Sequence, residues 1–340
     1  MLNRKECIMS VYKKFLFLFL AAFAMSFSAC LVSHEAVQAN NAAPQLVLVE
    51  HHLDAKDSGD IYQVITDAGF GYETPDDERW GNHPGVRHID RVFDQTLNKN
   101  VFALNIHYDD KVKDTWVNSG VRGGPVNDLQ NSQQVDRQRN ELKTDNTSPA
   151  WGKARRGSEA TYRWKFKLPA GFVASAQFTH IHQLKAVGGD DSSPIITLSV
   201  RKRTGFTQQE MQLVYRYASD SAVDHNRYLV EKILLEDFLD EWVSVEEKVF
   251  FDDENPAYEF TAVRVSDGKT LMHYKYDKDS WTEDVPFRTF RRGNNFVRPK
   301  WGIYRQLLRN DNGNWVEVSG PLRDETVLFA DIGIETLTAR

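Results

Sequence analysis

Cysteine is almost absent from this chain of 340 residues, which contains only two. Both of them, Cys7 and Cys30, lie within the first 39 residues, so residues 40–340 contain none. That part of the chain can form no disulfide and has no thiol chemistry, so its stability must come from a packed core. A chain of this length is ample for such a core.

An excess of positive charge is also absent. The sequence has 42 Lys and Arg residues against 48 Asp and Glu residues, which gives a formal net charge of −6. A net negative charge provides no overall attraction to nucleic acid or to other polyanions. We therefore expect no nucleic-acid partner, and any anion-binding site must be a local basic patch.

Long amphipathic helices are the third absence. Residues 228–239 have the only pattern compatible with one, and they fit a strand followed by a turn equally well. Asp267-Gly268 predicts a tight hairpin turn. Short alternating runs bounded by turn residues recur instead, at residues 101–107, 161–168, 178–185, 195–202, 212–217, 242–251, 260–265, 270–276, 300–307 and 326–334.

These patterns predict an all-β fold, namely a β-jelly-roll sandwich of two antiparallel sheets. In such a sandwich one sheet is commonly concave and open, so we expect it to form a groove for an extended ligand. No Pro/Ser-rich linker interrupts the chain, so we predict a single domain over residues 40–340. We expect the protein to be a monomer.

The start of the chain has the pattern of a secretory signal peptide. Lys13 and Lys14 precede an almost wholly apolar run at residues 15–32, and Val37-Gln38-Ala39 offers a cleavage site. We therefore predict a signal peptide at residues 1–39. Lipid attachment at Cys30 and retention of the run as an N-terminal anchor are two alternatives. All three place the protein outside the cytoplasm, secreted or periplasmic, and without a lipid at Cys30 or an anchor we expect no membrane association.

Three segments carry reactive side chains on alternate residues, and in a β-strand residues i and i+2 share a face. In the first, Arg137, Arg139 and Glu141 stand at every second position. The second is His180-Ile181-His182, and the third contains Lys300 and Tyr304. We therefore expect His180 and His182 to point the same way, on a polar sheet face that can hold an anion and move protons.

These segments resemble the β-jelly-roll polysaccharide lyases, the group that includes family 7 alginate lyases, heparin lyase I and glucuronan lyase. The alginate lyases carry Arg-(Ser/Thr)-Glu-Leu, Gln-(Ile/Val)-His and Tyr-Phe-Lys-Ala-Gly-(Ile/Val)-Tyr in this order. The corresponding residues of this chain are 139–142, 180–182 and 298–304, so the resemblance spans most of residues 40–340. His180 stands where alginate lyases have Gln, and Asn140 stands where they have Ser or Thr, which argues against alginate as the substrate.

The resemblance implies cleavage of a uronic-acid polysaccharide by β-elimination. The sugar carboxylate must be neutralised, the C5 proton removed and the leaving oxygen at C4 protonated. Arg139 and His180 are then expected to neutralise the carboxylate, His182 to act as base or neutraliser, and Tyr304 to act as acid. We expect the remaining site residues to position or bind the substrate: Glu141, Lys300, Arg298, Arg137 and Arg305.

We therefore predict an endo-acting lyase on glucuronan, ulvan or a related glucuronic-acid polymer, with an alginate lyase as the alternative. The aromatic-rich composition also allows a non-catalytic carbohydrate-binding module. A retaining glycoside hydrolase would need a Glu-x-Asp-x-x-Glu pattern, which this sequence lacks.

Metals and cofactors have little support in the sequence. Cupins bind metal through a His-x-His pair, but they add a Glu a few residues later, where this chain has Ala186 and Val187. We therefore predict no metal in the site and no required cofactor. The Asp190-Asp191 pair leaves Ca²⁺ as an alternative.

Overall fold

The computed structural model describes residues 46–77, 83, 85–108, 128, 136–202, 208–221, 226–311, 314–317 and 322–339. The predicted signal peptide and Cys30 lie outside the described residues. Residues 44–340 form one compact unit. Within the described ranges, no helix is long and apolar enough to cross a membrane.

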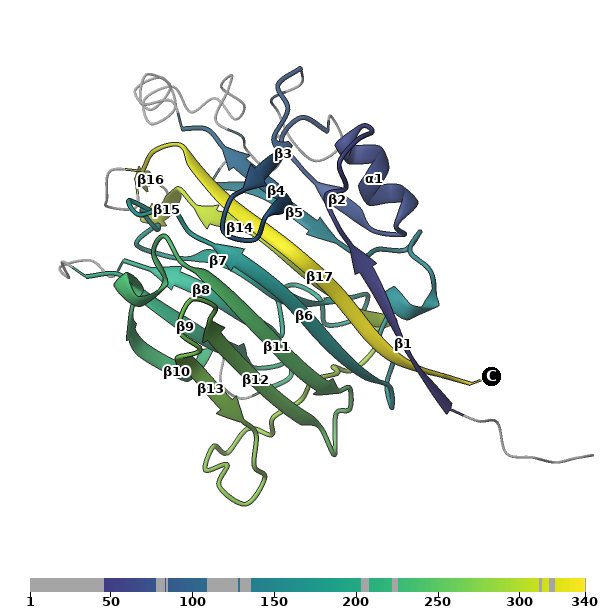
Figure 1. The fold of residues 1–340 in the computed structure, drawn as a ribbon. Helices are drawn as coiled ribbons and strands as arrows, with labels where there is room; N and C mark the ends of the chain where they lie inside the picture. The colour runs from purple at the N-terminus through teal and green to yellow at the C-terminus, as the bar shows by residue number, and fades with distance from the viewer. Residues whose placement is uncertain are drawn as a thin grey trace, which may run out of the picture. The chain divides into compact units, whose positions relative to one another are not determined.

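Two antiparallel sheets make up the fold, as predicted (Figure 1). The first has the order β13-β12-β11-β6-β17-β4-β3, with β1 also paired to β17, and the second has the order β10-β9-β8-β7-β14-β5-β2. The strands of the first sheet are β1 (Leu46–Leu53), β3 (Ile89–Asp94), β4 (Lys99–Ile106), β6 (Glu159–Lys167), β11 (Trp242–Phe250), β12 (Ala257–Arg264), β13 (Thr270–Lys275) and β17 (Glu325–Ala339).

The second sheet lies behind the first in the view of Figure 1. Its strands are β2 (Gly71–Glu73), β5 (Arg137–Lys143), β7 (Thr179–Val187), β8 (Ile196–Arg201), β9 (Glu210–Arg216), β10 (Asn226–Leu234) and β14 (Phe296–Gln306). A separate hairpin is formed by β15 (Leu308–Asp311) and β16 (Asn314–Glu317).

Alternation of buried and exposed residues explains the strands. In β6, Tyr162, Trp164 and Phe166 are buried while the residues between them are not. The helical alternative for residues 228–239 is wrong, because these residues form β10 followed by a 3-10 turn at Leu235–Phe238. Backbone N–H and C=O groups of β10 hydrogen-bond to β9. They therefore do not need the hydrogen bonds that a helix would provide.

A short helix, α1 (Ile61–Asp67), was not expected from the sequence. The Asp60 side chain caps it by accepting hydrogen bonds from the backbone N–H groups of Tyr62 and Gln63. Its buried residues Ile61 and Ile65 belong to the main hydrophobic core, so packing holds a helix too short to be stable alone.

A polar contact crosses the core between the two sheets. His182 of β7 stacks on Trp164 of β6 with ring centroids 4.3 Å apart, and its Nε2 lies 2.8 Å from Oε2 of Glu247 on β11. The hydroxyl of Tyr258 donates to the other oxygen of Glu247 over 2.8 Å. His182 and Glu247 are both buried, so this contact ties the two sheets together where water does not reach.

His182 points into the core because β7 contains a β-bulge. Against β8, His180 pairs with Ser199 and His182 pairs with Leu198, so Ile181 is one residue too many. The extra residue reverses the alternation, and Ile181 and His182 both face inward. The expectation that His180 and His182 share a face is therefore wrong.

Gly302 is required where β14 passes β5. A Cβ atom at this position would lie 2.1 Å from the carbonyl oxygen of Asn140 and 2.7 Å from Cα of Glu141. Both are backbone atoms, which a side-chain rotation cannot move aside. This close approach explains the glycine between Lys300 and Tyr304.

Replacing this glycine should destabilise the fold strongly. We expect Gly302→Ala to lower the free energy of unfolding by about 3 kcal/mol, because the added methyl group forces the two backbones apart. Urea unfolding measures the change. Gly268→Ala is the control: nothing lies within 4 Å of its Cβ, so its positive φ should cost only about 1 kcal/mol. Equal losses in the two variants would contradict this account.

Removing the buried imidazole should also affect stability. We expect His182→Ala to lower the free energy of unfolding by about 3 kcal/mol, because it leaves a cavity against Trp164 and takes a partner from Glu247. His273→Ala, on an exposed position of β13, should change stability little. A His182→Ala protein as stable as the parent would show that the contact between the sheets is not needed.

Candidate active site

A groove crosses the outer face of the second sheet. Its cavity of about 250 Å³ is lined by side chains of β10, β9, β8, β7, β14 and β5, which are six adjacent strands. At a spacing of about 4.8 Å between strands, the lined region spans about 24 Å. The groove can therefore accommodate an extended ligand, as the sequence analysis expected of the second sheet.

Positive charge dominates the lining of this groove. Five cationic side chains reach it, and none of the described residues that line it is an Asp or Glu. The five are Arg137, Arg139, Lys185, Arg201 and Arg216. A low-dielectric groove with one sign of charge concentrates ligands of the opposite sign.

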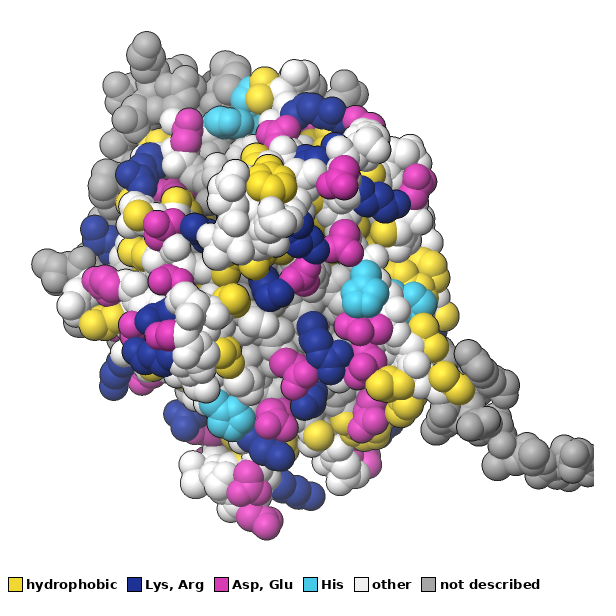
Figure 2. Space-filling model, viewed as in Figure 1, with side chains coloured by type: hydrophobic (Ala, Val, Ile, Leu, Met, Phe, Trp, Pro, Cys, Tyr) yellow, Lys and Arg dark blue, Asp and Glu magenta, His cyan; other side chains and the backbone are white. Residues whose placement is uncertain are grey.

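The outer face of the first sheet has a different charge pattern. Figure 2 shows cationic and anionic side chains intermingled across it. Arg163 lies 2.9 Å from Glu246 and 3.3 Å from Glu335, and Lys165 pairs with Asp331. The charges on that face pair with one another, whereas the described residues that line the groove include no carboxylate.

A buried charge network lies beside the groove, on the same face of the second sheet. Glu73 of β2 accepts hydrogen bonds from Lys300 (2.6 Å), Lys143 (2.9 Å) and Arg139. Lys300 also reaches Glu141 over 3.1 Å. Burial raises the pKa of Glu73, but the charges of Lys300, Arg139 and Lys143 outweigh it and hold this pKa well below its usual range. Both carboxylates therefore act as counterions that hold the cations in place.

Tyr304 lies in the groove among arginines. Its hydroxyl oxygen accepts a hydrogen bond from Nη1 of Arg137 over 2.9 Å, and the Arg139 guanidinium lies 4.0 Å from the centre of its ring. Its ring centre is 5.8 Å from that of His180. Because the oxygen accepts from Arg137, its own proton remains available to a ligand in the groove.

His180 is a neutral imidazole beside Tyr304. Its Nδ1 lies 2.7 Å from the hydroxyl oxygen of Ser199, which itself donates to Thr197 over 2.9 Å. The Ser199 oxygen therefore accepts the Nδ1 proton, and Nε2 keeps its lone pair. Burial, with the charges of Arg201 and the nearby arginines, lowers the pKa of His180 to about 3.

The structure brings four of the predicted site residues together at the groove: Arg137, Arg139, His180 and Tyr304. Glu141 and Lys300 lie in the buried network beside them. Arg298 lies at its edge, where it donates to the carbonyl of Thr144 and lies 3.8 Å from Glu73. The Glu141 carboxylate orients Arg139, with 3.3 Å between Oε2 and Nε.

Two predicted site residues lie elsewhere. His182 is in the core between the sheets, so it cannot take a proton from a ligand in the groove. Arg305 follows Tyr304 directly and therefore points to the opposite face, where it is fully buried and donates to the Gln138 side chain and the Arg323 carbonyl. The expectation that Arg305 binds substrate is wrong for this reason.

The sequence analysis missed several groove residues. Thr197, Ser199 and Arg201 alternate along β8 and share its polar face, a pattern that the sequence contains. On β7, Gln183 and Lys185 lie on the groove face because the bulge shifts the alternation. Counting every second residue from His180 would place both on the core face. Glu73 sits on a strand of three residues, which gives no periodic signal.

Comparison with known proteins gives matches among solved structures only. No protein-family model matches the chain, and no curated protein matches it. An alginate lyase from Pseudomonas aeruginosa is 15% identical, with a TM-score of 0.40 over 75% of this chain and 87% of that one. An alginate lyase from Klebsiella pneumoniae is 10% identical (TM-score 0.43; 74% and 84% covered), and an exolytic family 7 alginate lyase from Zobellia galactanivorans is 12% identical (0.44; 74% and 87%).

The groove should bind anions less well above pH 8. Burial and the charge of Lys300 lower the pKa of Lys185 to about 8, against the opposing charge of Asp191, and burial lowers the pKa of Lys300 to about 8 as well. Both amines lose their protons as the pH rises through this value. We expect the affinity for an anionic oligosaccharide to fall about tenfold from pH 7 to pH 9. Calorimetry measures the affinity at each pH.

A lysine-to-arginine exchange isolates the contribution of Lys185. Lys185→Arg keeps its charge at pH 9, so the fall should shrink to about threefold, the remainder coming from Lys300. Lys165→Arg, on the outer face of the first sheet, should leave the fall unchanged. Equal affinity of the parent protein at pH 7 and pH 9 would contradict the contribution of Lys185, in the groove, and of Lys300, in the buried network beside it, to anion binding.

Proposed function

We propose that this protein is a polysaccharide lyase that cleaves a uronic-acid polymer by β-elimination. The observation that carries the proposal is the groove itself, where five cations and no carboxylate line a path across six strands, with His180 and Tyr304 side by side within it. A polymer with one carboxylate on each sugar matches this charge, and elimination needs the proton-transfer groups that the groove contains.

The cationic lining supplies the first requirement of the reaction. The C5 proton of a uronate is a weak acid while the neighbouring carboxylate carries its full charge. Arg139 and Arg201 face the groove on either side of His180, and their guanidinium groups can hold that carboxylate and stabilise the charge that develops on it. The buried charge network keeps Arg139 in place through Glu73 and Glu141.

His180 and Tyr304 supply the proton transfers. Nε2 of His180 takes the C5 proton, the C4–oxygen bond breaks with its electron pair leaving on oxygen, and a double bond forms between C4 and C5. The Tyr304 hydroxyl protonates the leaving oxygen, and solvent returns both residues to their starting protonation states. His180 takes over the role that the sequence analysis assigned to His182.

The low pKa of His180 fits this role once substrate is bound. Burial depresses that pKa most, and the groove arginines, Arg201 first among them, lower it further. A bound carboxylate compensates these charges, so the pKa of His180 rises when the groove fills and the imidazole becomes a stronger base.

The carboxylates of the site do not support a glycoside hydrolase. A hydrolase needs a carboxylic acid that keeps its proton near the scissile bond. Glu73 is held ionised and buried among Lys300, Lys143 and Arg139, and Glu141 is buried against Lys300 and Gln183. A non-catalytic binding module would need neither the neutral His180 nor the hydroxyl of Tyr304 beside it.

We further propose glucuronan or ulvan as the polymer class and alginate as the alternative. His180 in place of the glutamine typical of alginate lyases supports the first choice. Endo action is supported by the length of the lined path, which extends over about 24 Å. The basic and apolar start of the chain supports export, with the protein acting as a monomer outside the cytoplasm.

Absorbance of the unsaturated product tests the reaction. The protein without residues 1–39 is incubated with glucuronan, ulvan and alginate, and absorbance near the ultraviolet band of the new double bond is followed. We expect a rise with at least one polymer, together with an early fall in viscosity that indicates endo cleavage. Retained binding without any absorbance change would reject the lyase in favour of a binding module.

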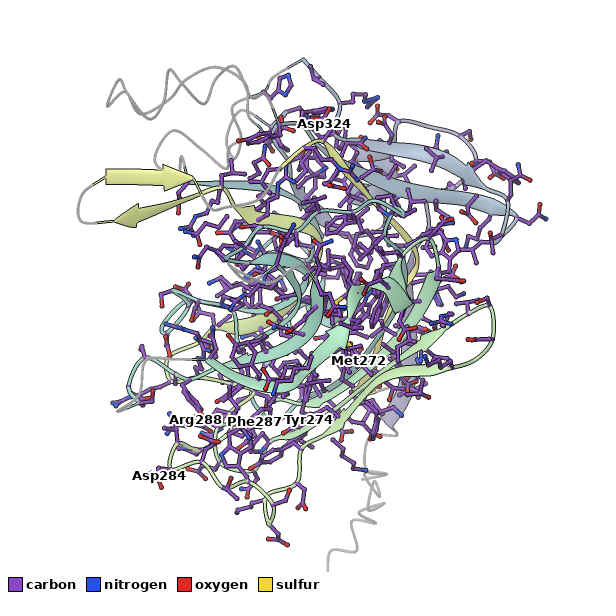
Figure 3. The ribbon with its side chains drawn as sticks, turned by 90° about the vertical axis from the view of Figure 1, so that its left-hand side faces the viewer. Met272, Tyr274, Asp284, Phe287, Arg288 and Asp324 are labelled. Atoms are coloured by element: carbon purple, nitrogen blue, oxygen red, sulfur yellow. The ribbon has the colours of Figure 1, made fainter. Side chains whose placement is uncertain are left out.

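Two variants test the assigned residues. We expect Tyr304→Phe and His180→Ala each to lower kcat by about 100-fold or more, because each removes one proton transfer, while binding changes little. Tyr274→Phe is the control, since Tyr274 lies on β13 of the other sheet and does not line the groove; Figure 3 labels it in the lower half of the view. Full activity of His180→Ala with loss in Tyr304→Phe would assign both transfers to Tyr304.

A further inference from the structure

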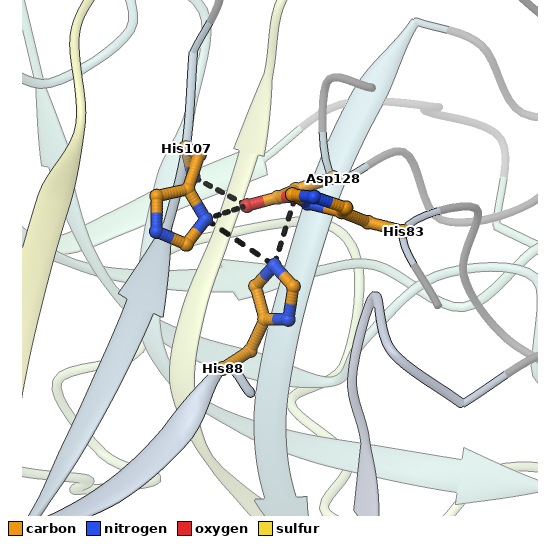
Figure 4. Close-up of side chains that lie close together, drawn as sticks. All are labelled: His83, His88, His107 and Asp128. Atoms are coloured by element: carbon orange, nitrogen blue, oxygen red, sulfur yellow. Dashed lines mark hydrogen bonds and ion pairs between the residues drawn. The ribbon is translucent and has the colours of Figure 1, made fainter. Parts of the chain in front are cut away.

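We propose that His83, His88, His107 and Asp128 form a binding site for Zn²⁺. One ligand atom from each of the four lies within 4.8 Å of all the others, and Figure 4 shows the three imidazoles arranged around the carboxylate. His88 and His107 lie at facing ends of β3 and β4, while His83 and Asp128 come from outside the strands. None of these residues lines the groove.

The distances between the ligand atoms suit a single small cation. Oδ1 of Asp128 lies 2.6 Å from Nδ1 of His83 and 2.9 Å from Nε2 of His88, and Oδ2 lies 3.0 Å from Nδ1 of His107. Nδ1 of His107 and Nε2 of His88 are 3.3 Å apart. Tetrahedral ligands at about 2.05 Å from zinc would be separated by about 3.3 Å.

Three imidazole nitrogens converge on the Asp128 carboxylate. Nδ1 of His83 and Nε2 of His88 face its Oδ1, Nδ1 of His107 faces its Oδ2, and the backbone N–H of His107 also donates to Oδ2. Protons on the ring nitrogens make the ring contacts hydrogen bonds. Without those protons, the three nitrogens and the carboxylate direct lone pairs at a common centre, where a cation can lie.

A second carboxylate orients one of the ligands. Nδ1 of His88 lies 3.2 Å from Oδ1 of Asp76, so the ring presents Nε2 to the centre of the cluster. Asp76 is itself held by hydrogen bonds from the hydroxyls of Tyr62 (2.6 Å) and Thr74. A carboxylate that accepts the outer N–H of a ligating histidine is the usual support of a zinc site.

The donor set selects zinc over calcium and magnesium. Three imidazole nitrogens and one carboxylate suit Zn²⁺, whereas Ca²⁺ and Mg²⁺ require oxygen ligands. Four protein ligands fill a tetrahedral shell, so the site is structural and leaves no position for substrate. Burial agrees with this, because the side chains of His88 and Asp128 are fully buried.

The site is fastened to the strand that carries the groove arginines. The side chain of Asn140 donates to the carbonyl of His88 over 2.7 Å, and that of Gln138 donates to the carbonyl of His107 over 2.5 Å. Gln138 and Asn140 alternate on β5 with Arg137 and Arg139, which face the groove. Zinc at this position would therefore stiffen β5 from its core side.

Metal content and thermal stability test the proposal without reference to activity. We expect the untagged protein to contain about one zinc per chain by mass spectrometry. Removing it with dipicolinate should lower Tm by about 5 °C or more, and Zn²⁺, but not Ca²⁺ or Mg²⁺, should restore the original Tm. Absence of stoichiometric zinc, with no change of Tm when Zn²⁺ is added, would overturn the proposal.

Variants separate the ligands from other histidines. We expect Asp128→Asn and His107→Ala to lose zinc, and Asp76→Asn, which touches the metal only through His88, to bind it 10- to 100-fold more weakly. His273→Ala is the control and should keep one zinc. Because Asp76→Asn keeps all four ligands, its measured affinity remains informative if the ligand variants do not fold. Unchanged zinc affinity in all three variants would refute the assigned ligands.

Discussion

The β-bulge at Ile181 is the constraint on which the arrangement of the site depends. It turns His182 into the core, where it stacks on Trp164 and reaches Glu247, and it leaves His180 in the groove beside Tyr304. One strand thereby supplies both a contact that joins the two sheets and an imidazole on the outer face. Without the extra residue, both imidazoles would lie on one face and the core would lose its polar contact.

The cations of the groove require carboxylate partners. Like charges at close range repel one another, and burial adds to the cost of each. Glu73 and Glu141 offset this by pairing with Arg139, Lys143 and Lys300 on the same face of the sheet. Both carboxylates are buried, so the described lining of the groove remains free of them.

Much of the fold follows from the sequence, and the site follows in part. Alternation of apolar residues, as in β6, identified the sandwich because each strand buries one face. The motif around Lys300 and Tyr304 led to the groove, and Gly302 within it is explained by the passing backbone of β5. The sequence could not reveal the bulge, since His-Ile-His has the same pattern with or without it. That single residue decided which histidine faces the ligand.

The histidine and aspartate cluster was beyond sequence reasoning for another reason. His83, His88, His107 and Asp128 are spread over 46 residues with no short repeated spacing. They meet because β3 and β4 pair along their length and bring the ends of distant segments together. Sequence patterns report on local periodicity, whereas this cluster depends on the register of the sheet.

The depressed basicity of His180 has a consequence for selectivity. In the free groove, burial lowers the pKa of this imidazole most, and the surrounding guanidinium groups lower it further. A ligand that carries negative charge relieves the second effect. A methyl-esterified polymer of the same shape would fit the groove and leave the imidazole a weaker base. The protein would then distinguish free acid from ester by charge compensation, with no need for a pocket that measures the missing methyl group.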